Sequence, residues 1–179
     1  MFVNDVGDPE GMDARPLPAL CVTETTFEPL NPLTREDKPT VPASFTILPR
    51  RGLVYVDYAG HVGLAEVFSI VEAYDRHPDR HPDQRHLVDL TRVTGFEHDP
   101  LTLMKLQARK ADIFTTTAMP SLVVYIAPTR VAMTLAQLAM RSWDGNDKII
   151  VRLQQDEAGA LNLLGLRHRT VAELLKADA

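Results

Sequence analysis

The chain has 179 residues, of which 45% are hydrophobic and 24% charged, so it can bury one full-sized core and is not a disordered polymer. Its net charge of −5 is carried by residues 1–42, and the rest of the chain is balanced, which leaves no basic stripe for a nucleic acid. No stretch approaches the ~20 apolar residues that span a bilayer, and the N-terminus lacks the pattern of a secretory signal.

Residues 1–42 predict a proline-rich, acidic N-terminal arm, followed by an α/β domain over residues 43–179. Seven prolines fall in the arm, and since proline fixes φ and lacks an N–H, long helices and central strands are excluded there. Two apolar pieces, residues 17–22 and 27–33, could still dock on the body. The single cysteine, Cys21, can form no disulfide within the chain, which suits a cytoplasmic protein.

A regular pattern begins after the arm. Residues 45–48 and 53–58 predict two strands joined by a tight turn at Arg51-Gly52, an antiparallel hairpin. Apolar residues at helical spacing then predict a helix from residue 64 to about 77, ended by a proline. Residues 87–90 predict a short strand before a loop over 91–100, and Asp99-Pro100 begins a helix that runs to about residue 114.

The C-terminal half continues the alternation. Residues 122–126 predict a strand buried on both faces, and Thr129 caps a helix through about Trp143. Residues 149–153 predict the last strand, Asp156 caps a short helix that ends at Gly165, and Thr170 begins a final helix. The order β-β-α-β-α-β-α-β-α predicts one mixed, mostly parallel β-sheet of about five strands, with the first strand antiparallel at an edge.

This order, with four segments, resembles the SpoIIAA-like branch of the STAS fold, bacterial α/β domains related to anti-sigma-factor antagonists, over residues 44–166. The segments are Gly52-Leu53-Val54-Tyr55-Val56, Leu87-Val88-Asp89-Leu90-Thr91-x-Val93-Thr94, Val123-Val124-Tyr125-Ile126-Ala127-Pro128, and the acidic start and Leu-rich end of residues 156–165. The resemblance implies a non-enzymatic module for protein partners or small hydrophobic ligands. Phospho-regulated members carry Asp-Ser-Ser-Gly where this chain has Glu97-His98-Asp99-Pro100, so phosphorylation control is not expected.

The carboxyl ends of the strands are the first candidate site. Asp89, Thr91 and Asp99 could converge there, where open α/β sheets bind ligands, and two carboxylates could perform acid–base chemistry. Local roles compete with this hypothesis, because Asp89 can accept loop N–H bonds and Asp99 can cap a helix. No nucleophile or phosphate-loop motif is present. We therefore expect no catalytic residue and no cofactor, and keep Asp89, Thr91, Thr94 and Asp99 as partner-binding candidates.

The helix after Thr129 is the second candidate. Its sequence is apolar nearly all round, which predicts that the arm, a second subunit or an apolar ligand covers it. The candidates there are Thr129, Arg130, Met133 and Met140, with Trp143 in the core.

The histidine-rich loop is the third. His77 and His81, with Asp79, Asp83 and His86 nearby, have the side chains of a transition-metal site. The prolines between them prevent helical stacking, so we expect a rigid polar loop and no metal site, with metal binding as the less favoured alternative.

These observations favour a cytoplasmic, non-enzymatic STAS-like binding or regulatory module that acts through protein contacts, with a protein partner or a second copy of itself. The alternative is a carrier of a small apolar ligand or lipid beside the helix at 129–143. An enzyme that uses Asp89 and Asp99 is the least favoured hypothesis.

Overall fold

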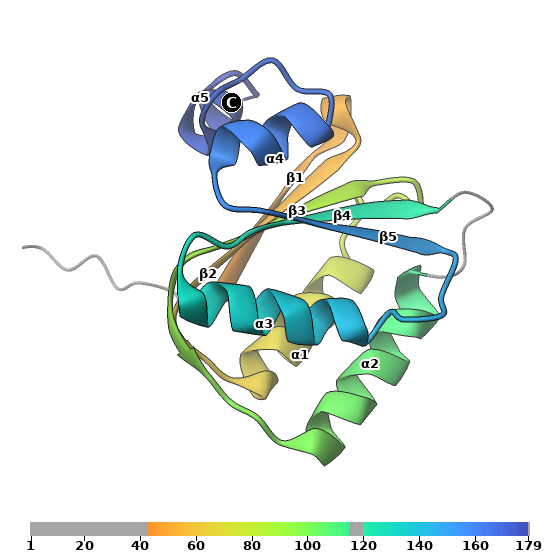
Figure 1. Cartoon of the computed structure of the whole chain (residues 1–179). Helices are drawn as coiled ribbons and strands as arrows, with labels where there is room; N and C mark the ends of the chain where they lie inside the picture. Colours follow the sequence, from red (N-terminus) through yellow and green to blue (C-terminus); the bar gives the residue numbers. More distant parts are fainter. Residues whose placement is uncertain (1–42, 115–119, 179) are drawn as a thin grey trace, which may run out of the picture. The chain divides into compact units, whose positions relative to one another are not determined.

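A computed structural model describes residues 43–114 and 120–178 (Figure 1). The expected proline-rich arm, with Cys21 and the apolar segments 17–22 and 27–33, lies outside the described residues. None of the described helices is long and apolar enough to cross a membrane.

The predicted hairpin is confirmed. Strands β1 (Ala43–Leu48) and β2 (Leu53–Val62) pair antiparallel, from Ala43 opposite Tyr58 to Leu48 opposite Leu53. A 3₁₀ turn, η1 (Pro49–Arg51), and Gly52 connect them. Gly52 has φ of 55°, in the left-handed region that glycine adopts without strain, and its N–H closes the turn on the Pro49 carbonyl.

The remaining strands and helices are β3 (Arg85–Phe96), β4 (Ser121–Ile126), β5 (Ile149–Gln154), α1 (Leu64–Asp75), α2 (Pro100–Phe114), α3 (Arg130–Arg141), α4 (Glu157–Leu163) and α5 (Val171–Lys176).

The sheet order is β1-β2-β3-β4-β5, with parallel pairing from β2 onward and β1 antiparallel at one edge, as predicted. Each new parallel strand is added on the same side of the previous one, so right-handed crossovers place the connecting helices on one face of the sheet. Figure 1 shows α1, α2 and α3 on that face, and α4 and α5 on the other.

Alternation along the strands gives each face of the sheet its own core. On β2, Val54 and Val56 contribute to the core under α1, α2 and α3, while Leu53 contributes to the core under α4 and α5. On β4, Val123 and Val124 divide in the same way. A continuous apolar run was the sequence signal for such a doubly covered strand, and the structure confirms it.

Two strands are longer than their apolar cores predict. β3 continues to Phe96, so Thr91 and Thr94 lie on a strand and not in the predicted loop. β2 continues beside it to Val62, with register shifts between Asp57 and Ala59 and between Gly60 and His61. The irregular pairing and the polar and glycine residues hide this extension from a pattern search.

Helix α3 corrects one expectation, because it has a clear polar side. Ala132 and Ala136 are fully buried against the sheet, and these small side chains let the helix lie close to it. The exposed positions are Arg130, Thr134, Gln137 and Arg141. The helix is therefore amphipathic. The prediction from sequence overestimated its apolar surface because alanine and methionine residues occupy the positions between its buried side and its exposed side.

Candidate functional site

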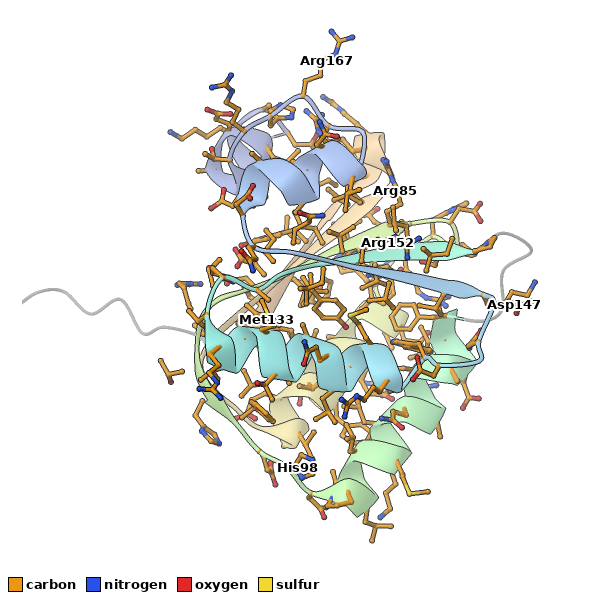
Figure 2. All side chains as sticks on the ribbon, viewed as in Figure 1. Arg85, His98, Met133, Asp147, Arg152 and Arg167 are labelled. Carbon is orange, nitrogen blue, oxygen red and sulfur yellow. The ribbon has the colours of Figure 1, made fainter. Side chains whose placement is uncertain are left out.

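A cavity of ≈ 130 Å³ lies between the sheet and helices α1, α2 and α3. Most of its wall is apolar. The sheet contributes Val56, Val88 and Val123, α1 contributes Val67 and Val71, and α3 contributes Leu135, Leu138 and Ala139. Figure 2 shows side chains from all three helices directed into this layer.

Helix α2 packs on α1. Arg109 of α2 forms ion pairs with Glu72 at 2.6 Å and Asp75 at 2.7 Å, both on α1. These contacts hold the pKa of Glu72 below, and that of Arg109 above, the usual value. The cavity residues Lys110 of α2 and Leu138 of α3 are half-buried.

Polar side chains interrupt the otherwise apolar wall. Tyr74, Glu97 and Ser142 take part in hydrogen bonds. Within residues 43–114 and 120–178, no side-chain hydrogen bond or ion pair engages Tyr58 of β2, His86 of β3, Tyr125 of β4, or Gln107 and Lys110 of α2. Tyr58, His86 and Tyr125 are buried, with exposed fractions of 8%, 6% and 7%, but their polar atoms are not among the fully enclosed unpaired ones. These side chains therefore keep hydrogen-bonding capacity on the cavity wall that the described protein groups do not use.

Burial shapes the charge of these groups. It lowers the pKa of His86 to about 4, with smaller contributions from the charges of Lys110 and Arg80, so the imidazole is neutral at pH 7. It also lowers the pKa of Lys110 to about 8, which leaves the ammonium mostly protonated. Burial raises the pKa of Tyr125 to about 12 and raises that of Tyr58 as well. At neutral pH Lys110 therefore provides a positive charge beside the neutral phenols of Tyr58 and Tyr125 and the neutral imidazole of His86, and the wall also contains the Glu97 carboxylate.

One end of the cavity is closed by aromatic rings. The His86 ring stands edge-on to Tyr74 and Phe114, with centroid separations of 5.3 Å and 5.0 Å. Phe114 in turn meets Trp143 at 6.3 Å. The Tyr74 hydroxyl donates to the side-chain oxygen of buried Gln84 at 3.0 Å, which fixes this wall. Trp143 thus belongs to the core, as the sequence predicted, and it also lines the cavity.

The other end lies near Phe96 and Glu97. The Glu97 carboxylate lines the cavity and accepts the N–H of Leu64, the first residue of α1, at 2.9 Å. Gly63, the N-cap of α1, has no side chain that could accept this bond, so Glu97 supplies it from the next crossover. Part of the loop predicted for partner recognition thus has a structural role.

The structure places Asp89 and Asp99 in separate settings. Asp89 is buried on β3, accepts the Thr91 N–H at 2.9 Å and accepts the Tyr55 hydroxyl at 3.0 Å. Asp99 accepts the Thr102 N–H at 3.0 Å and caps α2. No hydrogen bond or ion pair joins the two carboxylates, and neither residue lines the cavity. Thr94 is exposed on β3.

The candidates on α3 lie beside the cavity wall. The Thr129 side chain accepts the Ala132 N–H at 3.1 Å and caps the helix, as predicted. Arg130 is exposed, and Met133, labelled in Figure 2, is half-buried, as is Met140. The cavity is lined instead by the neighbouring α3 positions Leu135, Leu138 and Ala139, with Ser142 and Trp143 after the helix.

The histidines of the charged loop serve local turns. The Nδ1 atoms of His77 and His81 accept the N–H groups of Asp79 at 3.1 Å and Asp83 at 3.4 Å. His86 belongs to β3 and lines the cavity. Among the residues that the structure describes, no three His, Cys, Asp or Glu side chains gather in a way that could hold a metal ion.

The sequence did not lead us to predict that Tyr58, His86, Tyr125 and Lys110 line a cavity, although two features of the sequence indicated it. Tyr58, His86 and Tyr125 each occupy a core-facing position in an alternating strand, where an aliphatic residue is usual. Lys110 follows Leu106 and precedes Phe114 by four residues each, so it lies on the inner face of α2. A polar residue on such a face is the sequence sign of a lined cavity.

No family model matches the chain, and no curated protein matches it. Among solved structures it is similar to an uncharacterized protein of the DUF3478 family with a SpoIIAA-like fold, from Shewanella loihica PV-4. The identity is 16% and the TM-score 0.41, over 63% of this chain and 83% of that chain. The fold named for that protein is the one that the sequence resembles over residues 44–166.

Proposed function

We propose that this chain is a non-enzymatic module that binds one small, largely apolar ligand in the cavity beneath α1, α2 and α3. The observation that carries the proposal is the set of unpaired polar groups, Tyr58, His86, Tyr125 and Lys110, around an apolar wall. Ligand sites commonly combine an apolar lining with a few convergent polar groups that fix orientation. A ligand would supply the partners that the described protein groups lack.

The size of the cavity limits the ligand. An engineered apolar cavity of ~150 Å³ is known to stay dry and to bind benzene, and the cavity here is of similar volume at ≈ 130 Å³. The site therefore fits a molecule with a body of about one six-membered ring or a short branched chain. Lipids with long acyl chains exceed this volume unless α2 moves.

We propose that this module binds its ligand without catalysing a reaction. Asp89 and Asp99, the carboxylates considered for acid–base catalysis, are engaged by Tyr55 and Thr91 and by the N-terminus of α2. Neither lies in the cavity wall. A cytoplasmic location stays a prediction from the lone Cys21.

Calorimetric titration of the full chain with benzyl alcohol tests the proposal. We expect saturable binding with a stoichiometry of one by the wild-type protein and no binding by Ala139→Phe, because a phenyl group from α3 would fill the cavity. Ala108→Phe, at an exposed position of α2, is the matched control and should bind as the wild type does. Urea unfolding establishes that both variants are folded.

Failure to bind benzyl alcohol, toluene or benzoate by a folded wild-type protein would contradict the proposal. Equal binding by Ala139→Phe and the wild type would show that any binding occurs elsewhere on the chain.

Protein contact remains a second candidate function, favoured by one observation. Leu101 and Met104, at the start of α2 directly after the predicted recognition loop, are 62% and 67% exposed. We propose a second copy of this chain as their partner. Sedimentation of the full chain should give a dimer that Leu101→Ser with Met104→Ser converts to a monomer, and a wild-type monomer at all concentrations would contradict it.

A further inference from the structure

We propose that the ligand of this cavity is a small carboxylic acid, bound as its anion, with the carboxylate at Lys110 and the apolar body inside. This inference rests on the proposed binding function and adds the chemical class of the ligand. Lys110 is the cationic side chain in the cavity wall, and the other polar wall groups are placed to complete the recognition of an acceptor.

The first step is the charge of Lys110. No described acidic side chain forms an ion pair with it, whereas the adjacent Arg109 has two carboxylate partners. The carboxylate in the cavity wall, Glu97, is already the acceptor for the Leu64 N–H. A partly buried charge without a counter-ion is unfavourable, and an anionic ligand would remove that cost.

The second step is the balance of donors and acceptors. Tyr58 and Tyr125 each offer an unused hydroxyl donor, and the ammonium of Lys110 offers three N–H donors. His86 is neutral, so one of its ring nitrogens adds another donor. Together with the two N–H groups of Gln107, these donors outnumber the acceptors that the Gln107 oxygen, the second His86 nitrogen and Glu97 contribute. A carboxylate, which only accepts, fits such a site better than an alcohol or an amine.

The third step excludes more highly charged ligands. Phosphate groups are usually held by several N–H groups at a helix N-terminus or by more than one cation. The described wall of this cavity has one lysine and no arginine, and its α2 segment near Lys110 belongs to the second half of that helix. Besides Lys110 the wall carries the Glu97 carboxylate, which further disfavours a ligand with more than one negative charge, so a monocarboxylate fits best.

The fourth step is the position of Lys110. Lys110 is half-buried on α2, whereas Tyr125, Val88 and Val123 are buried on the sheet. The ionised end of a ligand would therefore stay near the solvent-accessible side, and its apolar body would lie against the valines. This arrangement avoids full desolvation of the carboxylate.

Calorimetry with benzoate and benzyl alcohol at pH 7 tests the inference, because the two probes share a ring and differ in charge. We expect benzoate to bind the wild-type chain at least about tenfold more tightly, since a charge-assisted hydrogen bond contributes that much or more. Lys110→Met should lose about tenfold in benzoate affinity and keep its affinity for benzyl alcohol. Lys105→Met, which removes an exposed lysine from the same helix, should match the wild type.

Binding of benzyl alcohol by Lys110→Met also shows that this variant folds. If the wild-type chain binds benzyl alcohol as tightly as benzoate, or if Lys110→Met keeps full benzoate affinity, the carboxylate inference is wrong and the cavity remains a site for neutral ligands. If the wild-type chain binds neither probe, the proposed function itself is wrong.

Discussion

The rings of His86 on β3 and Phe114 at the end of α2 meet edge-on, with 5.0 Å between their centroids. Lys110 lies about one helical turn before Phe114, so this contact also determines where the lysine stands relative to the sheet. The same His86 ring contacts Tyr74 of α1. One buried imidazole thus joins the sheet to two helices at the closed end of the cavity, and its protonation should affect the whole domain.

We predict that acidification destabilises the protein partly through His86. Its pKa is about 4 in the folded chain and 6.5 as its ordinary value, so the unfolded state binds the proton more tightly. Stability is therefore fully present above pH 6.5 and is lost as the pH falls towards 4, by about 2 kcal/mol between pH 7 and pH 5. Urea unfolding of the wild type and His86→Phe at both pH values measures the difference.

The phenylalanine variant keeps an aromatic ring against Tyr74 and Phe114 but has nothing to protonate. An equal loss of stability in both proteins between pH 7 and pH 5 would show that His86 is not the responsible group.

We predict that the cavity tyrosines tolerate loss of their hydroxyls. Tyr58→Phe and Tyr125→Phe remove groups without described partners, so the free energy of unfolding should change by less than about 0.5 kcal/mol. Tyr74→Phe is the matched contrast, because its hydroxyl donates to Gln84, and its loss should cost about 1 kcal/mol. Denaturant unfolding without ligand checks all three, and a large loss in the first two would mean that their hydroxyls are paired.

The affinity for benzoate should fall at alkaline pH. The pKa of Lys110 is about 8 in the free protein, so between pH 7 and pH 9 the protonated fraction falls about tenfold, and affinity should fall with it. The other titratable groups of the wall are His86, Tyr58, Tyr74, Tyr125 and Glu97, and the pKa of Tyr74 is raised to about 12. His86 is neutral throughout this range, and all three tyrosine pKa values are raised beyond it. Lys110→Met should show no such dependence, and a parallel decline in that variant would assign the effect elsewhere.

Asp99 should act as a helix cap and not as a recognition group. Hydrogen bonds from the hydroxyl and the N–H of Thr102 lower the pKa of Asp99, so the ionised form is favoured at the N-terminus of α2. Asp99→Ala should lower the melting temperature by a few degrees, while Asp99→Asn, which retains a capping oxygen, should lower it less. Both should bind benzoate as the wild type does. A loss of benzoate binding in the asparagine variant would show that Asp99 takes part in ligand binding.

Local chemistry made much of the fold predictable. Thr129 caps α3, Thr170 caps α5 and Gly52 closes the first hairpin, because each of these roles depends on one residue and its near neighbours. The sheet order followed from the alternation of strands and helices and from the handedness of their connections.

The cavity could not be predicted because it depends on distances between helices. The ion pairs of Arg109 hold α2 against α1, and the fully buried Ala132 and Ala136 bring α3 close to the sheet. Sequence patterns locate the faces of helices but not the gaps between them. They predicted Met133 and Met140 as ligand candidates on α3, whereas Leu138 and Ala139 of the same apolar helix line the cavity.

The most direct test of a ligand in this cavity is methyl NMR of the full chain during titration with benzoate. Val56, Val88 and Val123 line the cavity, whereas Leu53, Leu87 and Leu164 pack in the core on the opposite face of the same sheet. We predict saturable shifts of the three valine methyl signals and unchanged leucine signals. Unchanged valine signals at saturating benzoate, or shifts confined to the leucines, would contradict the account.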